Sequence, residues 1–503
     1  MQCGDKKDEI AGTSGRKSKS LKARWMSTVI SSAIAILMTS MSAETKADSL
    51  TAVLKTGVNS HPEFLALSAN RRAIREELMA AKGLGLPGVK LEGRHGRLND
   101  DNVSQDYGEW SVTLRQPLFD GGRTKSEVSR QNNRVQSATE RVNDTGNTIA
   151  LQIVQAYLEV QRARHVASVA RKNEKVIRQI VGKVSSRVAT GAANGADKEL
   201  ALSRLYAAQN ITAESEIRLE DAKALFVTLV KREPGKLRSV KLHSNFFPKS
   251  LGTAISSARS ASPKVLAMQY DALASEFAIG TAKSAVLPKL DLELSANHRD
   301  RIQGTSAENT TYKAMVVFSM SLYNGGINAA RIREAEQRAD EARELANAAA
   351  LTVEREIRLA WNIYSGTPKK VRALNAQAES SLRVKRLRKK QYEAGTSSLI
   401  AILDAQNEYI VSKVQAINES SMRKFAYFKI LAATGDLLNT FNINIGEEEL
   451  DVDPLVITSS IAVPTLAPSK QTQKFAIAEV RPVARKLKKA KSHNRKRRYV
   501  NDR

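Results

Sequence analysis

The stretch Leu118-Phe-Asp-Gly-Gly122 returns later in the chain as Leu322-Tyr-Asn-Gly-Gly326, and this repetition decides the fold. Three further landmarks recur in the same order, each 201 or 204 residues after its first occurrence: His61-Pro62 as Ser262-Pro263, Leu86-Pro87 as Leu287-Pro288, and Ala189-Thr-Gly191 as Glu393-Ala-Gly395. One small insertion accounts for all four offsets, so the sequence indicates two copies of one structural unit. We place the copies at residues 48–252 and 253–441.

Each copy contains three segments with helical periodicity. They lie at about 49–83, 124–190 and 196–232 in the first copy, and at about 253–285, 327–393 and 398–435 in the second. At 1.5 Å per residue, the middle segment of each copy would reach about 100 Å and the outer segments about 50 Å each. Two short helices placed end to end therefore match one long helix, which predicts a bundle and not a compact globular core.

The long segment of the first copy carries a seam of apolar residues spaced alternately four and three apart, except for one step of seven between Ala170 and Ile177. The seam consists of Ile149, Ile153, Ala156, Val160, Ala163, Ala167, Ala170, Ile177, Val181, Val184 and Val188. This heptad rhythm keeps one face of a helix against a neighbour. An ordinary amphipathic helix is the alternative, but the pattern continues for more than about ten turns. We therefore expect coiled-coil packing.

Between the first and second helical segments of each copy, the period of the sequence changes to two. We expect strands at about 89–97 and 108–119 in the first copy, and at about 289–298 and 312–323 in the second. The clearest case is 289–298, where leucines alternate with charged residues: Leu290, Leu292 and Leu294 with Lys289, Asp291 and Glu293. Such alternation gives a strand one apolar and one polar face.

A pair of glycines follows the second strand of each copy. Gly121 and Gly122 come after Asp120, and Gly325 and Gly326 come after Asn324. Because glycine reaches backbone conformations that other residues avoid, these pairs predict sharp turns from strand into helix.

Strands of about ten residues with one apolar and one polar face are what an outer-membrane barrel requires. Four strands per chain are too few to close a barrel, and an open sheet in lipid would leave its edge N–H and C=O groups unsatisfied. Other copies of the chain must therefore complete the sheet. The alternative is a soluble hairpin resting on a helix, which would show the same alternation.

An apolar run, Met26–Ala43, follows five basic residues near the N-terminus. This is the layout of a secretory signal peptide, here residues 1–47, with cleavage after Ala43 or Ala47. A membrane anchor is the alternative, but the run is short and mixed with Ser and Thr. Cys3 is the only cysteine and precedes the run. The exported protein would then have no thiol for disulfides or catalysis.

About half of the net charge of +27 lies at the two ends of the chain. Residues 1–47 carry +4 and residues 481–503 carry +10. We interpret 442–503 as a linker followed by a disordered basic tail. After export this tail would meet no nucleic acid, which weakens the case for nucleic-acid binding that a high pI would otherwise raise.

No motif for catalysis stands out. The six histidines are scattered without metal-ligand spacing, and the sequence contains no phosphate-binding loop and no Gly-x-Ser-x-Gly elbow. We therefore expect a protein that is not an enzyme and has no cofactor and no metal.

Over about residues 48–441, the two copies resemble the outer-membrane channel proteins typified by TolC. The resemblance rests on the Leu-Pro before each first strand, on the stretches 116–122 and 319–326, and on Tyr392-Glu-Ala-Gly-Thr-Ser-Ser-Leu-Ile-Ala-Ile-Leu-Asp-Ala405. It implies a mainly α fold with membrane β-structure. A long coiled-coil helical barrel would adjoin a 12-stranded transmembrane β-barrel, to which each chain of a homotrimer contributes four strands.

The same resemblance implies a cellular location and a function. The channel would sit in the Gram-negative outer membrane, in contact with its lipid, and extend into the periplasm. It would dock with a periplasmic adaptor and an inner-membrane transporter and conduct exported proteins or small molecules. Stretches such as Ala156-Tyr-Leu-Glu159 favour type I protein secretion slightly over multidrug efflux.

The resemblance also implies a gate where the helical tips around Gly191 and Gly395 close the tunnel. Tyr392 would pair with Asp197, and Asp404 would belong to a ring of carboxylates in the constriction. The chain departs from the family pattern at two places: a second carboxylate position holds Ala401, and a gate-linking arginine position holds Ser397.

Both gate assignments have ordinary alternatives. Tyr392 could be a seam residue of a coiled coil, and Asp404 could lie on a solvated helix face. At the level of the whole protein, the rival function is a periplasmic coiled-coil adaptor or scaffold that never enters the membrane. An adaptor predicts lipoyl-like or barrel domains around one helical hairpin, whereas this sequence has two equivalent copies.

Overall fold

The computed structural model describes residues 49–100, 103–242, 245–300 and 309–443, with the side chains of 98–105 and 107 excepted. These residues belong to one compact unit. The elements of the first copy are α2 (Leu50–Asn59), α3 (Pro62–Gly83), β1 (Gly88–Asp100), β2 (Val103–Phe119), α4 (Arg123–Ala189) and α5 (Gly195–Val230).

The second copy repeats this order. Its elements are α6 (Leu251–Ala261), α7 (Pro263–Lys283), the 3₁₀ turn η1 (Ser284–Val286), β3 (Lys289–Asp300), β4 (Asn309–Ser319), α8 (Ile327–Glu393) and α9 (Leu399–Thr434), followed by α10 (Leu437–Thr440). The long helices α4 and α8 both contain 67 residues, and α5 and α9 both contain 36. At 1.5 Å per residue the long helices extend about 100 Å, as expected from the sequence.

The first helical segment of each copy is broken, contrary to the sequence prediction. The chain is extended at His61 before Pro62 and at Ser262 before Pro263, so a short helix ends and a longer one begins at each site. Proline has no N–H to continue the preceding helix, and it pushes the residue before it out of the helical region. The continuous helices predicted at 49–83 and 253–285 were therefore wrong at these two positions.

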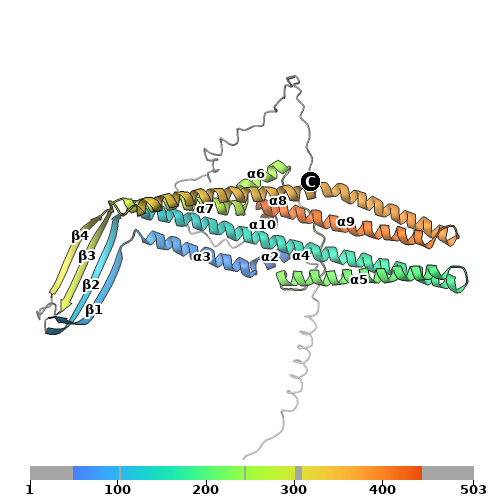
Figure 1. The fold of residues 1–503 in the computed structure, drawn as a ribbon, viewed down its shortest axis with the longest axis horizontal. Helices are drawn as coiled ribbons and strands as arrows, with labels where there is room; N and C mark the ends of the chain where they lie inside the picture. Colours follow the sequence, from blue (N-terminus) through green and yellow to red (C-terminus); the bar gives the residue numbers. More distant parts are fainter. Residues whose placement is uncertain (1–48, 101–102, 243–244, 301–308, 444–503) are drawn as a thin grey trace, which may run out of the picture. The chain divides into compact units, whose positions relative to one another are not determined.

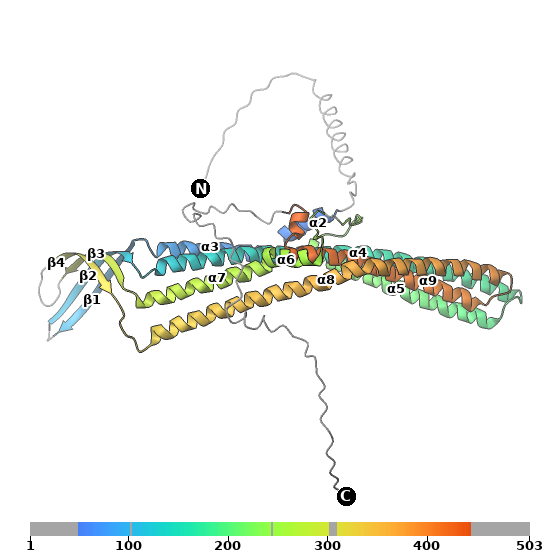
Figure 2. The same cartoon turned by 90° about the horizontal axis from the view of Figure 1, so that it is seen from above.

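The strand bounds also differ from the prediction. The first hairpin is longer than predicted, since β1 continues to Asp100 and β2 begins at Val103, whereas β4 ends at Ser319 and not near residue 323. The four strands form one antiparallel sheet in the order β1-β2-β3-β4. In Figures 1 and 2 the strands lie at one end of the helices, and the α4–α5 and α8–α9 turns lie at the other.

The helices pack as two hairpins around the long helices. Helix α4 packs against α3, α5, α7 and α9, and α8 packs against α7 and α9. The predicted seam of α4 is confirmed, because its residues from Ile149 to Ala170 are buried and so are Ile177 and Val184. Only Val181 and Val188, near the end of the helix, are half-buried.

The largest apolar cluster lies midway along the helices. Tyr157 of α4 and Tyr427 of α9 are both buried there, and the Tyr157 hydroxyl donates to the Arg238 carbonyl at 2.7 Å. The ring of Phe247 stacks on Tyr427 with 4.6 Å between centroids. This cluster therefore ties the segments that follow α5 to both long hairpins.

Candidate functional site: the helical tips and the sheet

The turns at the helical tips are built identically in the two copies. Gly191 and Gly395 have φ values of +73° and +75°, in the left-handed region that favours glycine. The amide after each glycine donates to the carbonyl five residues earlier, at 2.7 Å in the first copy and 2.8 Å in the second. This closes the C-terminal end of α4 and of α8, which brings α5 and α9 back alongside them.

A small apolar cluster joins the helices just above these turns. Its buried members are Val184 of α4, Ala201 of α5, and Leu399 and Leu403 of α9. Tyr392, in the last turn of α8, packs against this cluster. The tip is therefore a meeting point of all four helices and not two independent hairpins.

Arg187 connects the two tips, and the sequence analysis did not identify it. Its guanidinium lies over the Tyr392 ring, with Cζ 4.8 Å from the ring centroid. It also donates to the Tyr392 carbonyl at 3.2 Å and to the Ala192 carbonyl at 3.3 Å. An arginine in the last turn of a helix that ends at a glycine is the available sequence signal, since it can bond carbonyls left free there.

Tyr392 and Asp197 are not hydrogen-bonded to each other in this protomer. The Tyr392 hydroxyl is buried without a hydrogen-bond partner among the described residues, and so is the Ser397 Oγ. Asp197 lies half-buried in the first turn of α5. A carboxylate is favoured there by the helix dipole alone. The Tyr392–Asp197 pair thus stays a prediction.

Asp404 lies on an exposed face of α9, opposite Arg204 of α5. The Arg204 guanidinium nitrogen is 3.8 Å from a carboxylate oxygen of Asp404, and both side chains are at least half exposed. An ion pair so open to water holds its partners weakly. The Asp404 carboxylate is therefore open to solvent in the single chain, and Arg204 offsets part of its charge.

At the opposite end of the molecule, the sheet has two chemically different faces. The register sets Leu91 against Val112, Leu114 against Leu294, and Leu292 against Val316, so apolar side chains share one face. Members of this face are strongly exposed in the single chain, for example Leu91 (72 %), Tyr312 (79 %) and Phe318 (65 %).

The other face of the sheet is polar. It lines a cavity of about 270 Å³, whose walls include Glu92, Arg94, Thr113, Glu293 and Lys313. On the same face Arg299 donates to Glu109 at 3.0 Å across β2 and β3. A strand that lies between lipid and water has apolar residues on one face and ionic groups on the other, as these strands do.

The turns from strand into helix contain the four predicted glycines. Their φ values are +68° and +81° at Gly121 and Gly122, and +69° and +83° at Gly325 and Gly326. Gly121 is tightly packed as well, because a Cβ built on it would lie 2.7 Å from the Leu287 Cβ, whereas one on Gly325 would meet nothing within 4 Å.

Asp120 fixes the first of these turns. Its carboxylate accepts hydrogen bonds from the Gly122 amide at 3.0 Å, the Thr124 amide at 2.7 Å and the Thr124 hydroxyl at 2.6 Å. Burial by itself raises the pKa of Asp120, but these bonds to the charged form outweigh it and the pKa is lowered. In the second copy the neutral Asn324 caps α8 by accepting from the Asn328 amide at 3.2 Å.

Two absences concern only the described part of the chain. Among those residues, no three His, Cys, Asp or Glu side chains are grouped to hold a metal ion. None of the helices in the described ranges combines the length and apolar character needed to cross a membrane.

The family model described as "Outer membrane efflux protein" matches residues 54–225 and 254–436, one match in each copy. The chain belongs to this family. Each matched range includes the two strands and the tip glycine of its own copy.

Individual relatives agree with this membership. The chain is 26 % identical over 396 residues to the outer membrane efflux protein BepC of Brucella suis, covering 76 % of this chain and 84 % of BepC. It is 25 % identical over 358 residues to the outer membrane protein OprJ of Pseudomonas aeruginosa, covering 67 % of this chain and 72 % of OprJ. The crystal structure of the outer membrane protein VceC of Vibrio cholerae has the same fold, with a TM-score of 0.68, 14 % identity and coverage of 79 % and 97 %.

Family membership confirms several predictions. The chain is an outer-membrane channel subunit with a mainly helical fold and a small antiparallel sheet, and the periplasmic adaptor reading is not favoured. Its family consists of channels and not of enzymes.

Proposed function

We propose that three copies of this chain form one duct through the outer membrane, each contributing its four strands to a 12-stranded barrel. The observation that carries this proposal is the open sheet: β1 and β4 each have one neighbour in the single chain. In lipid, their unpaired N–H and C=O groups would each cost several kcal/mol. Pairing β1 of one copy with β4 of the next removes both edges.

The helices would continue the barrel into the periplasm as a tunnel. Their tips would close it near Gly191 and Gly395. Arg187 would hold the two tips of one protomer together. The buried Tyr392 hydroxyl has no acceptor among the described residues of its own chain. Closure of the trimer would bring it within reach of Asp197.

As in its family, the duct would act with a periplasmic adaptor and an inner-membrane transporter, which supply cargo and energy. The channel itself would conduct exported proteins or small molecules passively. The basic stretch Arg383-Val-Lys-Arg-Leu-Arg-Lys-Lys390 near the tip of α8 would favour acidic contacts on the side where partners arrive.

The assembly is tested by mass measurement of the detergent-solubilised protein. We expect a trimer with intact strand content. A stable monomer that keeps the same strand content would contradict the proposal, because the open edges would then be tolerated.

The gate is tested by single-channel recording of the double variant Tyr392→Phe, Asp197→Ala. We expect a higher conductance with unchanged trimer assembly. One phenol-to-carboxylate hydrogen bond contributes only about 1.5–3 kcal/mol, whereas the long seams hold the assembly. Tyr206→Phe is the control, since Tyr206 on α5 is 63 % exposed. Equal conductance in the unaltered protein, the double variant and the control would mean that Tyr392 and Asp197 are ordinary helix residues with no role in the gate.

A further inference from the structure

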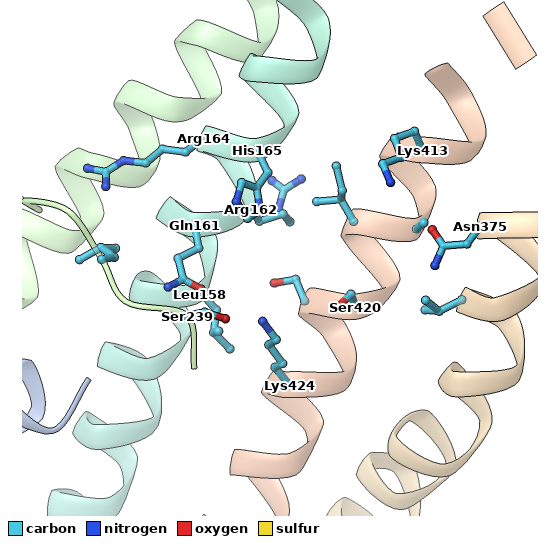
Figure 3. A pocket seen from close by; sticks show the side chains of 15 residues that line it. Leu158, Gln161, Arg162, Arg164, His165, Ser239, Asn375, Lys413, Ser420 and Lys424 are labelled. Atoms are coloured by element: carbon cyan, nitrogen blue, oxygen red, sulfur yellow. The ribbon is translucent and has the colours of Figure 1, made fainter. Parts of the chain in front are cut away.

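A second cavity, of about 370 Å³, lies midway along the helices, far from both the tips and the strands. It opens where α4, α8 and α9 meet the segment that carries Leu237 and Ser239 (Figure 3). In this view α4 contributes Arg162 and His165, and α9 contributes Lys413 and Lys424. The cavity is therefore lined by residues of both the α4–α5 hairpin and the α8–α9 hairpin.

The walls of this cavity are basic. Five cationic or ionisable basic side chains line it and no Asp or Glu does: Arg162, Arg164, His165, Lys413 and Lys424. The remaining polar lining can donate hydrogen bonds, from the hydroxyls and amides of Ser239, Ser420, Ser421, Gln161 and Asn375. Positive charge with many donors and no carboxylate is the chemistry of an anion site.

The two arginines already have partners, but the lysines do not. Arg162 forms a two-pronged ion pair with Glu159, and Arg164 donates to two backbone carbonyls at 2.6 and 2.7 Å. Lys413 and Lys424 make no hydrogen bond or ion pair with any residue that the structure describes. Their charges are therefore uncompensated within this part of the chain.

Lys424 is half-buried, and this burial lowers its pKa. Desolvation of an ammonium group is unfavourable unless an opposite charge is near. An anion in the cavity would supply that charge for Lys424 and for Lys413 together.

We propose that this cavity binds a small soluble oxyanion of the phosphate class, held between Lys413 and Lys424 of α9 and Arg162 and His165 of α4. Phosphate has the charge and the several acceptor oxygens that two ammonium groups and neighbouring hydroxyls can satisfy at once. The volume also admits a small phosphate monoester.

The position of the cavity separates a free anion from a lipid head group. Arg162 lies about 58 Å along α4 from the end of the sheet, at 1.5 Å per residue. A head group anchored at the strands cannot reach that far. The ligand is thus a dissolved anion.

The site also spans two parts of the fold. Helix α4 belongs to the α4–α5 hairpin and α9 to the α8–α9 hairpin. An anion bound to both would hold the hairpins together at mid-length. It would therefore raise the thermal stability of the assembled channel.

The test uses the full-length protein, purified in detergent without phosphate. Calorimetric titration with inorganic phosphate and the thermal midpoint in phosphate are compared with sodium chloride at equal ionic strength. We expect saturable phosphate binding and a higher midpoint in phosphate only. Lys413→Gln or Lys424→Gln should weaken binding about tenfold each, the loss expected for one charge-assisted hydrogen bond.

Two variants make the result specific. Lys429→Gln changes a lysine on the same helix that does not line the cavity, and Lys424→Arg keeps the charge, so both should bind phosphate as the unaltered protein does. The proposal fails if the unaltered protein does not bind phosphate, if chloride gives the same rise, or if the Lys413→Gln, Lys424→Gln double variant binds equally well. A cavity filled by an acidic side chain of a neighbouring copy would give the first of these results.

Discussion

The guanidinium of Arg187 stacks on the ring of Tyr392, 4.8 Å from its centroid, although the two residues are 205 positions apart in the chain. Arg187 belongs to α4 and Tyr392 to α8, so this contact links the tip of the first copy to the tip of the second.

Removing this link should loosen the gate. We expect Arg187→Ala to raise single-channel conductance, because it removes a cation–π contact of about 0.5–2 kcal/mol together with two hydrogen bonds to carbonyls. Arg178→Ala is the matched control, since Arg178 lies on the same helix but pairs with Glu174. If the two variants conduct alike, Arg187 has no part in closure.

Asp404 and Arg204 should have opposite effects on ion preference. If the Asp404 carboxylates ring the constriction, Asp404→Ala should lower the preference for cations and relieve block by multivalent cations. Arg204→Ala should increase that preference, because it removes the positive charge 3.8 Å away. Bilayer recordings with a salt gradient measure both. No change in either variant would place Asp404 on an ordinary solvated face.

The two faces of the sheet should differ in their tolerance of charge. Leu292→Arg and Phe318→Arg should each cost about 2–4 kcal/mol if the residue lies near the bilayer midplane. Glu293→Gln, on the polar face, should have little effect. Yield of folded trimer in an outer-membrane assembly assay tests this. Equal yields at the three positions would contradict lipid contact.

The strand-to-helix turns should respond unequally to the same substitution. Gly121→Ala and Gly325→Ala both place a side chain at positive φ, which costs about 1–2 kcal/mol. Only at Gly121 would the new Cβ also meet Leu287, adding about 1–3 kcal/mol. When unfolding in urea is followed by the loss of the helical signal, Gly121→Ala should therefore be less stable than Gly325→Ala. Equal loss would mean that Leu287 moves aside freely.

Asp120 should make stability depend on acid pH. Its folded-state pKa is lowered, so the carboxylate stabilises the fold above its ordinary pKa of about 3.9. That contribution is lost as the pH falls through this value toward the folded-state pKa. We expect Asp120→Asn to be less stable near pH 7 and to lose less stability below about pH 4. Thermal midpoints across that range measure it, and parallel pH profiles would exclude the role.

Much of the architecture could be predicted because it depends on local periodicity. The seam from Ile149 to Ala170 follows from heptad spacing, and the facing of Leu292 and Val316 follows from period two. The breaks before Pro62 and Pro263 were not predicted, although their cause is also local. The helical pattern continues on both sides of each proline and therefore favoured a single helical segment.

The details of the gate depend on contacts across the fold. Nothing near Arg187 in the sequence indicates that its partner is Tyr392, because the two residues meet only through the packing of the α4–α5 hairpin against the α8–α9 hairpin. The same holds for the cavity between α4 and α9. Lys424 lies in an ordinary amphipathic stretch, and only packing brings it opposite Arg162.

The sheet order has a further consequence for how copies would join. Because β1 and β4 are different edges, contact between copies in the proposed assembly would be head-to-tail, with β1 of one copy against β4 of the next. Such heterologous contacts close into a ring only when the rotation per subunit divides a full circle, and otherwise continue without end. The backbone hydrogen bonds between β1 and β4 would be the same at every contact between copies. They therefore do not determine how many copies form the ring. The size of the proposed ring would therefore depend on the curvature of the sheet and on the angle at which α4 and α8 leave it at their paired glycines.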